Sequence, residues 1–449
     1  MSYREKSFWL ETAGDYRERP PLEGDQTSDV CVVGGGFTGV SAALHLREKA
    51  PGIRVLVLES EVVGFGASGR NAGFSMTLFG LAPEVTLWRF GAARLREADE
   101  YMVRAVDLVR RRVAEHAIDC DYEENGLLTV ATNPAQRRRL LREMELARKA
   151  GLHETEWLET DAVRAQVNSP LFLGGRLDRH CALLNPAKLV RGLARAAEQA
   201  GAEIHERSPV LEVIPGARVR VRTPGGTVTA DKVIFATNAY SARLRPLRSR
   251  QLPVHTYIVL TEPLSPEQFA AIGWQRRQGI EDGRNLIHYF RLTRDNRLLM
   301  GGDDALYYWG SADDRDRHEA MQRRLQDAVK RIFPALSGVR FTHHWGGPIS
   351  ATLDLAPHIG RVGSNMFYSV GCMGHGVSLC NLNGATLADL ALERQTDLTD
   401  VFFVDRRALP APPEPLRFAV AEALLTGMRL QDCWHERGAA NLRETRPDR

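Results

Sequence analysis

The sequence predicts an α/β fold in which a parallel sheet is interleaved with a second, antiparallel sheet. Three observations predict it: a strand, spaced glycines and a helix near the N-terminus, further apolar strands later in the chain, and alternating strands between them. The 449 residues suffice for two domains, each with its own core. The formal charge of +3 gives no electrostatic reason to expect a nucleic-acid partner.

The first element is an apolar strand over 30–33, as expected where both faces of a parallel sheet are covered. Gly34, Gly36 and Gly39 then match G-x-G-x-x-G, which permits a tight turn, a close approach to a pyrophosphate and close helix packing. Glu59 ends the next strand, where a carboxylate can bind ribose hydroxyls and would repel a 2′-phosphate. The combination predicts an adenine-dinucleotide site; the alternative is a glycine turn without a ligand.

A second glycine-rich loop follows at 64–73. An extended FAD must be followed by backbone from its pyrophosphate to its isoalloxazine ring, whereas a nicotinamide cofactor has no such need. Ser68 and Asn71 offer small polar contacts, and Arg70 could face a phosphate or a ring carbonyl. The loop therefore favours FAD; the alternative is a flexible surface loop.

Later segments agree with FAD. A helix over 187–201 precedes short strands at 203–205 and 210–213, and another buried strand covers 232–240. A strand, a glycine loop and a helix follow over 366–392. The N-terminus of that helix would direct free amides toward the electron-rich O2 and N1 edge of a reduced flavin.

These motifs resemble the D-amino-acid oxidase superfamily of FAD-dependent amine and amino-acid oxidoreductases. The resemblance is carried by DVCVVGGGFTG, GFGASGRNAG, NPAKLVRGLARAAEQAGAEIHERSPV, DKVIFATNAYS and GCMGHGV. Within it, GFGASGRNAG, HTYIVLTEPL and WGGPISATLDLAPHIGR are most similar to the gamma-glutamylputrescine oxidase branch.

The resemblance implies a Rossmann-like FAD-binding domain of the glutathione-reductase type with an interleaved antiparallel-sheet substrate domain. We expect the FAD-binding domain to comprise 28–100, 175–245 and 340–400, and the substrate domain 101–174 and 246–339. The segments expected to form the substrate domain are distinguished by charged helices and by strands of alternating polarity, including a hairpin across 293–296. The remaining 401–449 would form a C-terminal linker and helix.

Residues from each motif are expected to hold FAD. The candidates are Gly34, Gly36, Phe37, Thr38, Gly39, Glu59, Ser60, Ala67, Ser68, Arg70, Asn71, Ala72, Val210, Thr237, Asn238, Gly347, Gly371, Gly374, His375, Gly376 and Val377. Monomeric sarcosine oxidases resemble this region but attach flavin through a cysteine that would fall near Gly347, so we expect non-covalent FAD. They also carry an oxygen-activating lysine near 299–300, where this chain has leucine and methionine, which weakens the case for a fast oxidase.

The resemblance implies that a hydride leaves the carbon alpha to an amine for flavin N5, giving an imine that hydrolyses. Desolvation suffices to keep the amine neutral, so no obligatory general base is expected. Members that oxidise amino acids carry an arginine just before the final P-x-I-G segment, whereas 345–354 has none. We expect an amine whose reacting carbon bears no carboxylate; the alternative is that Arg291 or Arg294 replaces the missing arginine.

The candidate catalytic residues are His375, Tyr257 and Arg291, and the candidate substrate contacts are Tyr289, Trp345 and Met373. The aromatic rings could wall an apolar slot and Arg291 could bind a remote acidic end. His375 could tune the flavin or stabilise its reduced anion. The alternatives are ordinary sheet-core residues and, for His375 between two glycines, tight backbone packing. Adjacent histidines 343–344 would face opposite sides of a strand, so no metal site is expected.

The expected partners are a small-molecule amine and oxygen or another electron acceptor. No segment approaches the eighteen apolar residues of a membrane span, and the charged segment 1–21 lacks a signal-peptide core. With six scattered cysteines and no C-x-x-C pair, these features predict a cytoplasmic location. An apolar helix over 416–430 is expected to pack on the body, or on a homo-oligomeric or other subunit partner. Rival functions are a dehydrogenase that reduces a quinone or protein, and a non-catalytic flavin-holding subunit.

Overall fold

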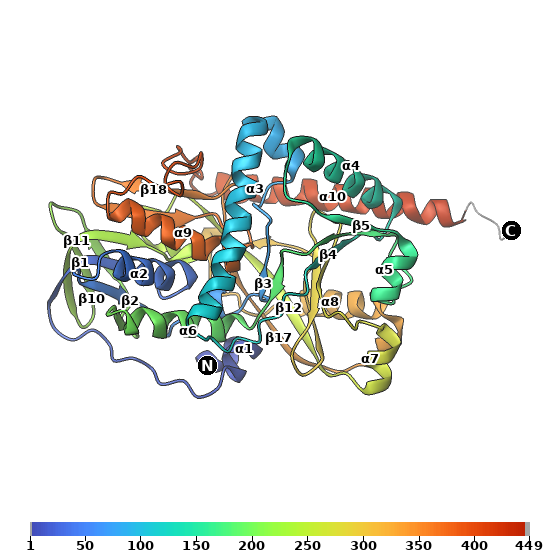
Figure 1. The fold of residues 1–449 in the computed structure, drawn as a ribbon, viewed down its shortest axis with the longest axis horizontal. Helices are drawn as coiled ribbons and strands as arrows, with labels where there is room; N and C mark the ends of the chain where they lie inside the picture. The colour runs from blue at the N-terminus through green and yellow to red at the C-terminus, as the bar shows by residue number, and fades with distance from the viewer. Residues whose placement is uncertain (1, 445–449) are drawn as a thin grey trace.

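The computed structural model describes residues 2–444, whose strands form two large sheets lying side by side and one small two-stranded sheet (Figure 1). The first sheet has the order β18-β19-β11-β1-β2-β8; β10 also pairs with β11, and β9 pairs with β10. The pairs of β1 with β2 and with β11 are parallel, as predicted. Its strands are β1 (Gln26–Val33), β2 (Val55–Leu58), β8 (Glu203–His205), β9 (Glu212–Ile214), β10 (Val219–Thr223), β11 (Gly226–Phe235), β18 (His358–Val362) and β19 (Met366–Val370).

Helices cover one face of this sheet. In Figure 1, α2 (Phe37–Lys49) and α9 (Gly376–Ala391) lie side by side over it, with α6 (Pro186–Gln199) beside α2. Val30 and Val32 pack toward these helices, whereas Cys31 and Val33 pack into the core on the opposite face. The continuous apolar run of β1 therefore has the predicted cause, because both faces of the strand are buried.

The second sheet has the order β16-β12-β15-β14-β13-β4-β6-β5, with β17 paired along β12. The predicted hairpin is present as β14 and β15. The strands are β4 (Leu127–Val130), β5 (Glu156–Leu158), β6 (Gly175–Asp178), β12 (Leu252–Pro263), β13 (Gly279–Asp282), β14 (His288–Leu292), β15 (Arg297–Gly302), β16 (Leu306–Tyr307) and β17 (Phe341–Ala351). The small sheet pairs β3 (Phe74–Ser75) with β7 (Ala182–Leu183).

The two faces of the second sheet have different neighbours. Successive side chains of a strand alternate between faces, and directly paired residues share one. Ile258 and its partner Trp345 pack in a cluster with Phe8 and Phe74, toward the first sheet. Tyr257 lies on the opposite face, in the cluster that includes α8 (Glu319–Ile332). This alternation decides which candidate side chains can reach a site between the sheets.

The expected domain limits at 101, 175 and 340 do not coincide with the sheets. Helix α3 (Pro83–Glu115) runs through 101 and packs on α9 of the first sheet. Strands β6 and β17 fall inside the expected FAD-binding segments yet belong to the second sheet. The chain crosses between the sheets four times, as the expected segments imply, but it returns to the first sheet only after β6 and after β17.

The C-terminal helix α10 (Leu416–Glu444) extends beyond the predicted 416–430 and contacts α4 and β16, so it packs on the body. Figure 1 shows it in red, running beneath α4. Within residues 2–444, no helix combines the length and apolar content that crossing a bilayer requires. The other helices are η1 (Tyr3–Lys6), α1 (Phe8–Thr12), η2 (Ala67–Gly69), α4 (Pro134–Ala150), α5 (Thr160–Gln166), η3 (Asn238–Arg243), α7 (Pro266–Ile272), η4 (Trp309–Ser311) and η5 (Pro334–Leu336).

Candidate cofactor and active site

A cavity of about 450 Å³ opens where β1, β2 and β11 end. Residues that follow each of these strands line it, together with the second glycine loop and the turn before α9. Ligands of open α/β sheets bind at the carboxyl ends of the parallel strands. The cavity therefore lies where the sequence motifs predict a dinucleotide.

The first glycine motif has the geometry that its pattern requires. Gly34 adopts φ +111°, and a Cβ there would lie 2.6 Å from the carbonyl oxygen of Ala236. A Cβ at Gly39 would lie 1.9 Å from the carbonyl oxygen of Gly34, so only glycine lets α2 pack this close to the turn. The amide of Phe37, the first residue of α2, donates to Ser68 Oγ at 3.0 Å. The N-terminus of α2 thus opens onto the cavity, where it favours an anion.

Glu59 is fixed at the end of β2. Its carboxylate accepts the backbone N–H of Gly35 at 2.7 Å and of Glu61 at 3.0 Å. Burial raises the pKa of Glu59, and these hydrogen bonds oppose that rise. The side chain lines the cavity with further acceptor capacity, which suits the ribose hydroxyls that the sequence predicts.

Arg70, in the second glycine loop, lies at the cavity wall with its guanidinium engaged. Nε donates to the carbonyl oxygen of Phe65 at 2.8 Å, and Nη1 pairs with Asp316 at 2.5 Å. Lys6 also pairs with Asp316. Asp316 comes from the loop between β16 and α8, where Asp313 pairs with Arg243 at 2.5 Å. Ion pairs therefore join the N-terminal segment and this acidic loop to the cavity.

Sequence patterns did not single out these acidic residues, because a charged loop resembles a solvated one. The cavity-lining residues that the sequence patterns missed include Lys6, Phe65, Tyr240, Arg243, Asp313, Asp314, Asp316, Ile349, Cys372 and Cys380. The predicted residues that line the cavity are Gly34, Gly36, Phe37, Thr38, Glu59, Ser60, Ala67, Ser68, Arg70, Asn71, Val210, Thr237, Asn238, Gly374, Gly376 and Val377.

Other predicted contacts are not among the described lining residues: Gly39, Ala72, Gly347, Gly371 and His375. Gly39 acts through helix packing, as described above. A Cβ at Gly347 would lie 3.4 Å from Cδ of Arg70, so this residue lies directly behind the cavity wall. Gly371 adopts φ +81° and makes room for Thr352 in the turn before α9. These glycines therefore shape the site by packing.

His375 precedes the first turn of α9. Its Nδ1 is buried and has no hydrogen-bond partner among residues 2–444. Burial lowers the pKa of His375 to about 4, so the imidazole is neutral at pH 7. A role of His375 in tuning the flavin or stabilising its reduced anion stays a prediction, and the amides and dipole of α9 are available for the same task.

The structure places Arg291 away from the described lining of the cavity. Its guanidinium is buried, and Nη1 donates to the carbonyl oxygens of Leu184 at 2.7 Å and Gly73 at 3.1 Å. It is not among the described residues that line the cavity. Arg294, the other candidate for a missing arginine, is 72% exposed and pairs with Asp121. Arg291 instead holds the second glycine loop against the strand region around 184.

Tyr257 and Trp345 also lie outside the described cavity lining. The hydroxyl of Tyr257 bonds to the Tyr308 hydroxyl at 2.7 Å and to the Arg315 carbonyl at 3.0 Å, on the face turned toward α8. Trp345 lies on the correct face, but Nε1 donates to the carbonyl oxygen of Arg70 at 2.8 Å, behind the cavity wall. Both side chains stabilise the surroundings of the site from outside the described lining.

Tyr289 and Met373 lie closer to the expected places. Tyr289 is on the face turned toward the first sheet and packs edge-on against Phe74, with 6.1 Å between ring centroids. Met373 adopts φ 50° in the turn before α9 and packs beside Gly80. Neither is among the described lining residues, so substrate contact by these two side chains stays a prediction.

Known proteins agree with this site. The family model described as FAD dependent oxidoreductase (DAO) matches residues 29–390. The chain belongs to this family. It is 36% identical to gamma-glutamylputrescine oxidoreductase of Escherichia coli (strain K12) over 392 residues, which is 87% of this chain and 89% of the relative. It is 26% identical to glycine oxidase of Bacillus licheniformis over 389 residues, 84% of this chain and 97% of that one. Among solved structures, glycine oxidase from Geobacillus kaustophilus matches its fold, with a TM-score of 0.72 at 21% identity, over 86% of this chain and 100% of that chain.

The protein is therefore an FAD-dependent oxidoreductase, and its cavity residues fit that cofactor. Glu59 would hold the adenosine ribose, and the amides around Gly36 would bind the pyrophosphate. Arg70, Asn71 and the start of α9 would surround the flavin ring. Bound FAD supplies the acceptor for a hydride from a C–H bond. The protein supplies orientation, exclusion of water and the fixed dipoles around that ring.

Proposed function

We propose that this enzyme oxidises a small or gamma-glutamylated amine at the carbon alpha to nitrogen, and that the resulting imine hydrolyses in water. The observation that carries the proposal is the pairing of arginines at the cavity. Among the described lining residues, Arg70 pairs with Asp316, and Arg243 pairs with Asp313. Recognition of an alpha-carboxylate requires an arginine whose fork is free for bidentate binding. An amine without that carboxylate suits such a site better.

Two further observations support this choice. Arg291 and Arg294, the residues most able to replace the missing arginine, have other partners. The 36% identity to the gamma-glutamylputrescine oxidoreductase covers most of both chains. Catalysis then depends on holding the substrate C–H close to the flavin and on desolvation, which lowers the pKa of the substrate ammonium. The paired acids at the cavity also tolerate a cationic amine better than an anionic substrate.

The electron acceptor is proposed to be oxygen, with a quinone or an electron-transfer protein as the alternative. The oxygen-activating lysine of monomeric sarcosine oxidases would fall near position 299 of this chain. Leu299 is instead a buried leucine on the face turned toward the first sheet. The absence of a lysine at this position is the reason for retaining a dehydrogenase as the alternative. Peroxide formation and quinone reduction are therefore measured in parallel.

Turnover of an amine panel by the FAD-loaded enzyme tests the proposal. The panel contains gamma-glutamylputrescine, putrescine, sarcosine, glycine and D-alanine, with peroxide, ammonia and a soluble quinone as readouts. We expect kcat/KM to be highest for an amine that lacks an alpha-carboxylate. A higher kcat/KM for glycine or D-alanine would contradict the proposal, because the paired arginines would then have to bind the carboxylate.

A further inference from the structure

The C-terminal helix α10 lies beyond residues 29–390 that match the family, yet an apolar cluster joins it to the cavity wall. Leu425 of α10 is only 9% exposed and packs in this cluster with Val254 of β12. Ile349 is the paired neighbour of Val254 on β17, and it both lines the cavity and packs against the cluster. Met373, in the turn before α9, packs there too. Ile349 thus belongs both to the cavity lining and to the side chains packed against the cluster that α10 completes.

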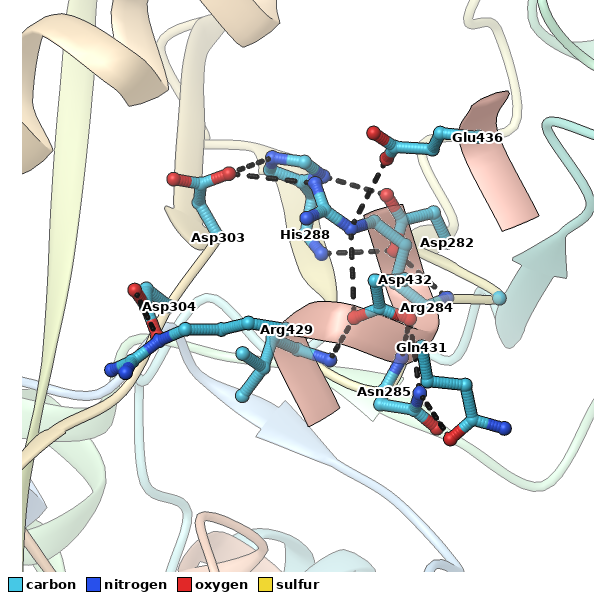
Figure 2. A network of polar contacts seen from close by, with 12 residues as sticks. Asp282, Arg284, Asn285, His288, Asp303, Asp304, Arg429, Gln431, Asp432 and Glu436 are labelled. Carbon is cyan, nitrogen blue, oxygen red and sulfur yellow. Dashed lines mark hydrogen bonds and ion pairs between the residues drawn. The ribbon is translucent and has the colours of Figure 1, made fainter. Parts of the chain in front are cut away.

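Polar contacts fix α10 at this position. Asp432 is 3% exposed, and its carboxylate accepts the backbone N–H of Asn285 at 2.9 Å and of Leu286 at 3.0 Å. Leu286 is itself a member of the apolar cluster. Figure 2 shows these contacts beside the pair between Arg429 and Asp304, with 3.0 Å between nitrogen and oxygen. A buried carboxylate with two backbone donors sets the position of the helix along its axis.

The residues at the start of α10 are tied to the acidic loop. The Tyr307 hydroxyl donates to Glu414 at 2.7 Å, and Arg417 donates to Ser311 Oγ at 3.0 Å. Two residues after Ser311, Asp313 lines the cavity. The segment that leads into α10 therefore restrains the loop whose acids pair with the cavity arginines.

We propose that α10 is a specificity element of the active site, in which Leu425 positions Ile349 and Met373 and so limits the size of the amine beside the flavin. The inference rests on the proposed function, because it assumes an amine at this cavity. Its physical basis is packing, since a side chain that is supported from behind cannot retreat. Removal of the Leu425 side chain would leave a void into which the wall relaxes.

A matched pair of variants tests the proposal in the FAD-loaded enzyme. Leu425→Ala removes the buried side chain, and Leu424→Ala removes its neighbour, which is 43% exposed. The probes are tert-butylamine and the bulkier 1-adamantylamine, which have no hydrogen on the carbon bonded to nitrogen and so cannot be oxidised. Binding is followed through the visible flavin band. We expect Leu425→Ala to shift the ratio of the two Kd values about tenfold toward the bulkier amine. A ratio equal to that of Leu424→Ala would overturn the proposal.

A second measurement needs no amine. Quenching of flavin fluorescence by acrylamide reports solvent access to the ring, and we expect Leu425→Ala to raise the quenching constant above that of Leu424→Ala. If no amine of the turnover panel is oxidised, the proposed function fails, and equal quenching in the two variants then refutes the role of α10 separately. If Leu425→Ala gives no FAD-loaded protein, Leu425→Val removes a single methylene and is expected to shift both readouts in the same direction.

Discussion

Replacement of Gly39 by alanine would test the first glycine motif directly. The added Cβ would lie 1.9 Å from the carbonyl oxygen of Gly34, whereas ordinary contact begins at 3.4 Å. Helix α2 and the turn must therefore move apart by about 1.5 Å. A displacement of this size is expected to destabilise the protein by about 3 kcal/mol, at the upper end of the usual cost of overpacking. For a chain of 449 residues we expect Tm to fall by roughly 3 °C. Because FAD binding requires the native turn, its Kd should rise on the order of tenfold to a hundredfold.

The assay is titration of the apoprotein with FAD, followed by flavin fluorescence, together with thermal unfolding. Gly52→Ala is the matched control, since Gly52 follows the same helix and a Cβ there would meet nothing within 4 Å. The reasoning would be refuted if Gly39→Ala bound FAD and unfolded like Gly52→Ala. Equal loss in both variants would point to a general effect of alanine near α2.

Three further predictions concern the cofactor, the cavity arginine and pH. Acid precipitation should leave the yellow colour in the supernatant, because Gly347 stands where a flavin-linking cysteine would be; colour in the pellet would contradict this. Arg70→Lys cannot bond both the Phe65 carbonyl and Asp316, so FAD affinity should fall by about 1–3 kcal/mol, and an unchanged Kd would count against the site. Burial opposes the charge of His288, but Asp282 and Asp303 outweigh it and raise its pKa to about 9. Because this pKa is above the unfolded value of about 6.5, the stabilisation is complete below pH 6.5 and is lost as pH rises through 9. Tm of His288→Gln should therefore fall less over this range than that of the wild type; parallel curves would exclude the effect.

Local chemistry made the cofactor site predictable from the sequence. The roles of Gly34 and Gly39 follow from which backbone atoms approach each other in a strand, turn and helix, and the structure confirms them. The position of Glu59 follows from the end of the next strand, and its side chain does line the cavity. The geometry of such motifs is set by residues close together in the sequence, so it can be predicted from the sequence pattern alone.

The substrate side was less predictable because it depends on contacts between distant segments. Tyr257 and Trp345 both lie in strands of the second sheet, but only the pairing register shows that they face opposite sides. Arg291 looked available for a substrate, whereas carbonyl oxygens from distant loops occupy its guanidinium. Asp316 belongs to a charged loop whose approach to Arg70 no local pattern indicates.

Anaerobic mixing of the FAD-loaded enzyme with single amines tests the central claim most directly. The visible flavin band should bleach with putrescine or gamma-glutamylputrescine and stay unchanged with glycine or D-alanine. Admission of air afterwards separates an oxidase, which recovers its colour quickly, from a dehydrogenase, which recovers it slowly. Bleaching by an amino acid but by neither amine would contradict the account, because the paired arginines would then be the wrong guide to the substrate.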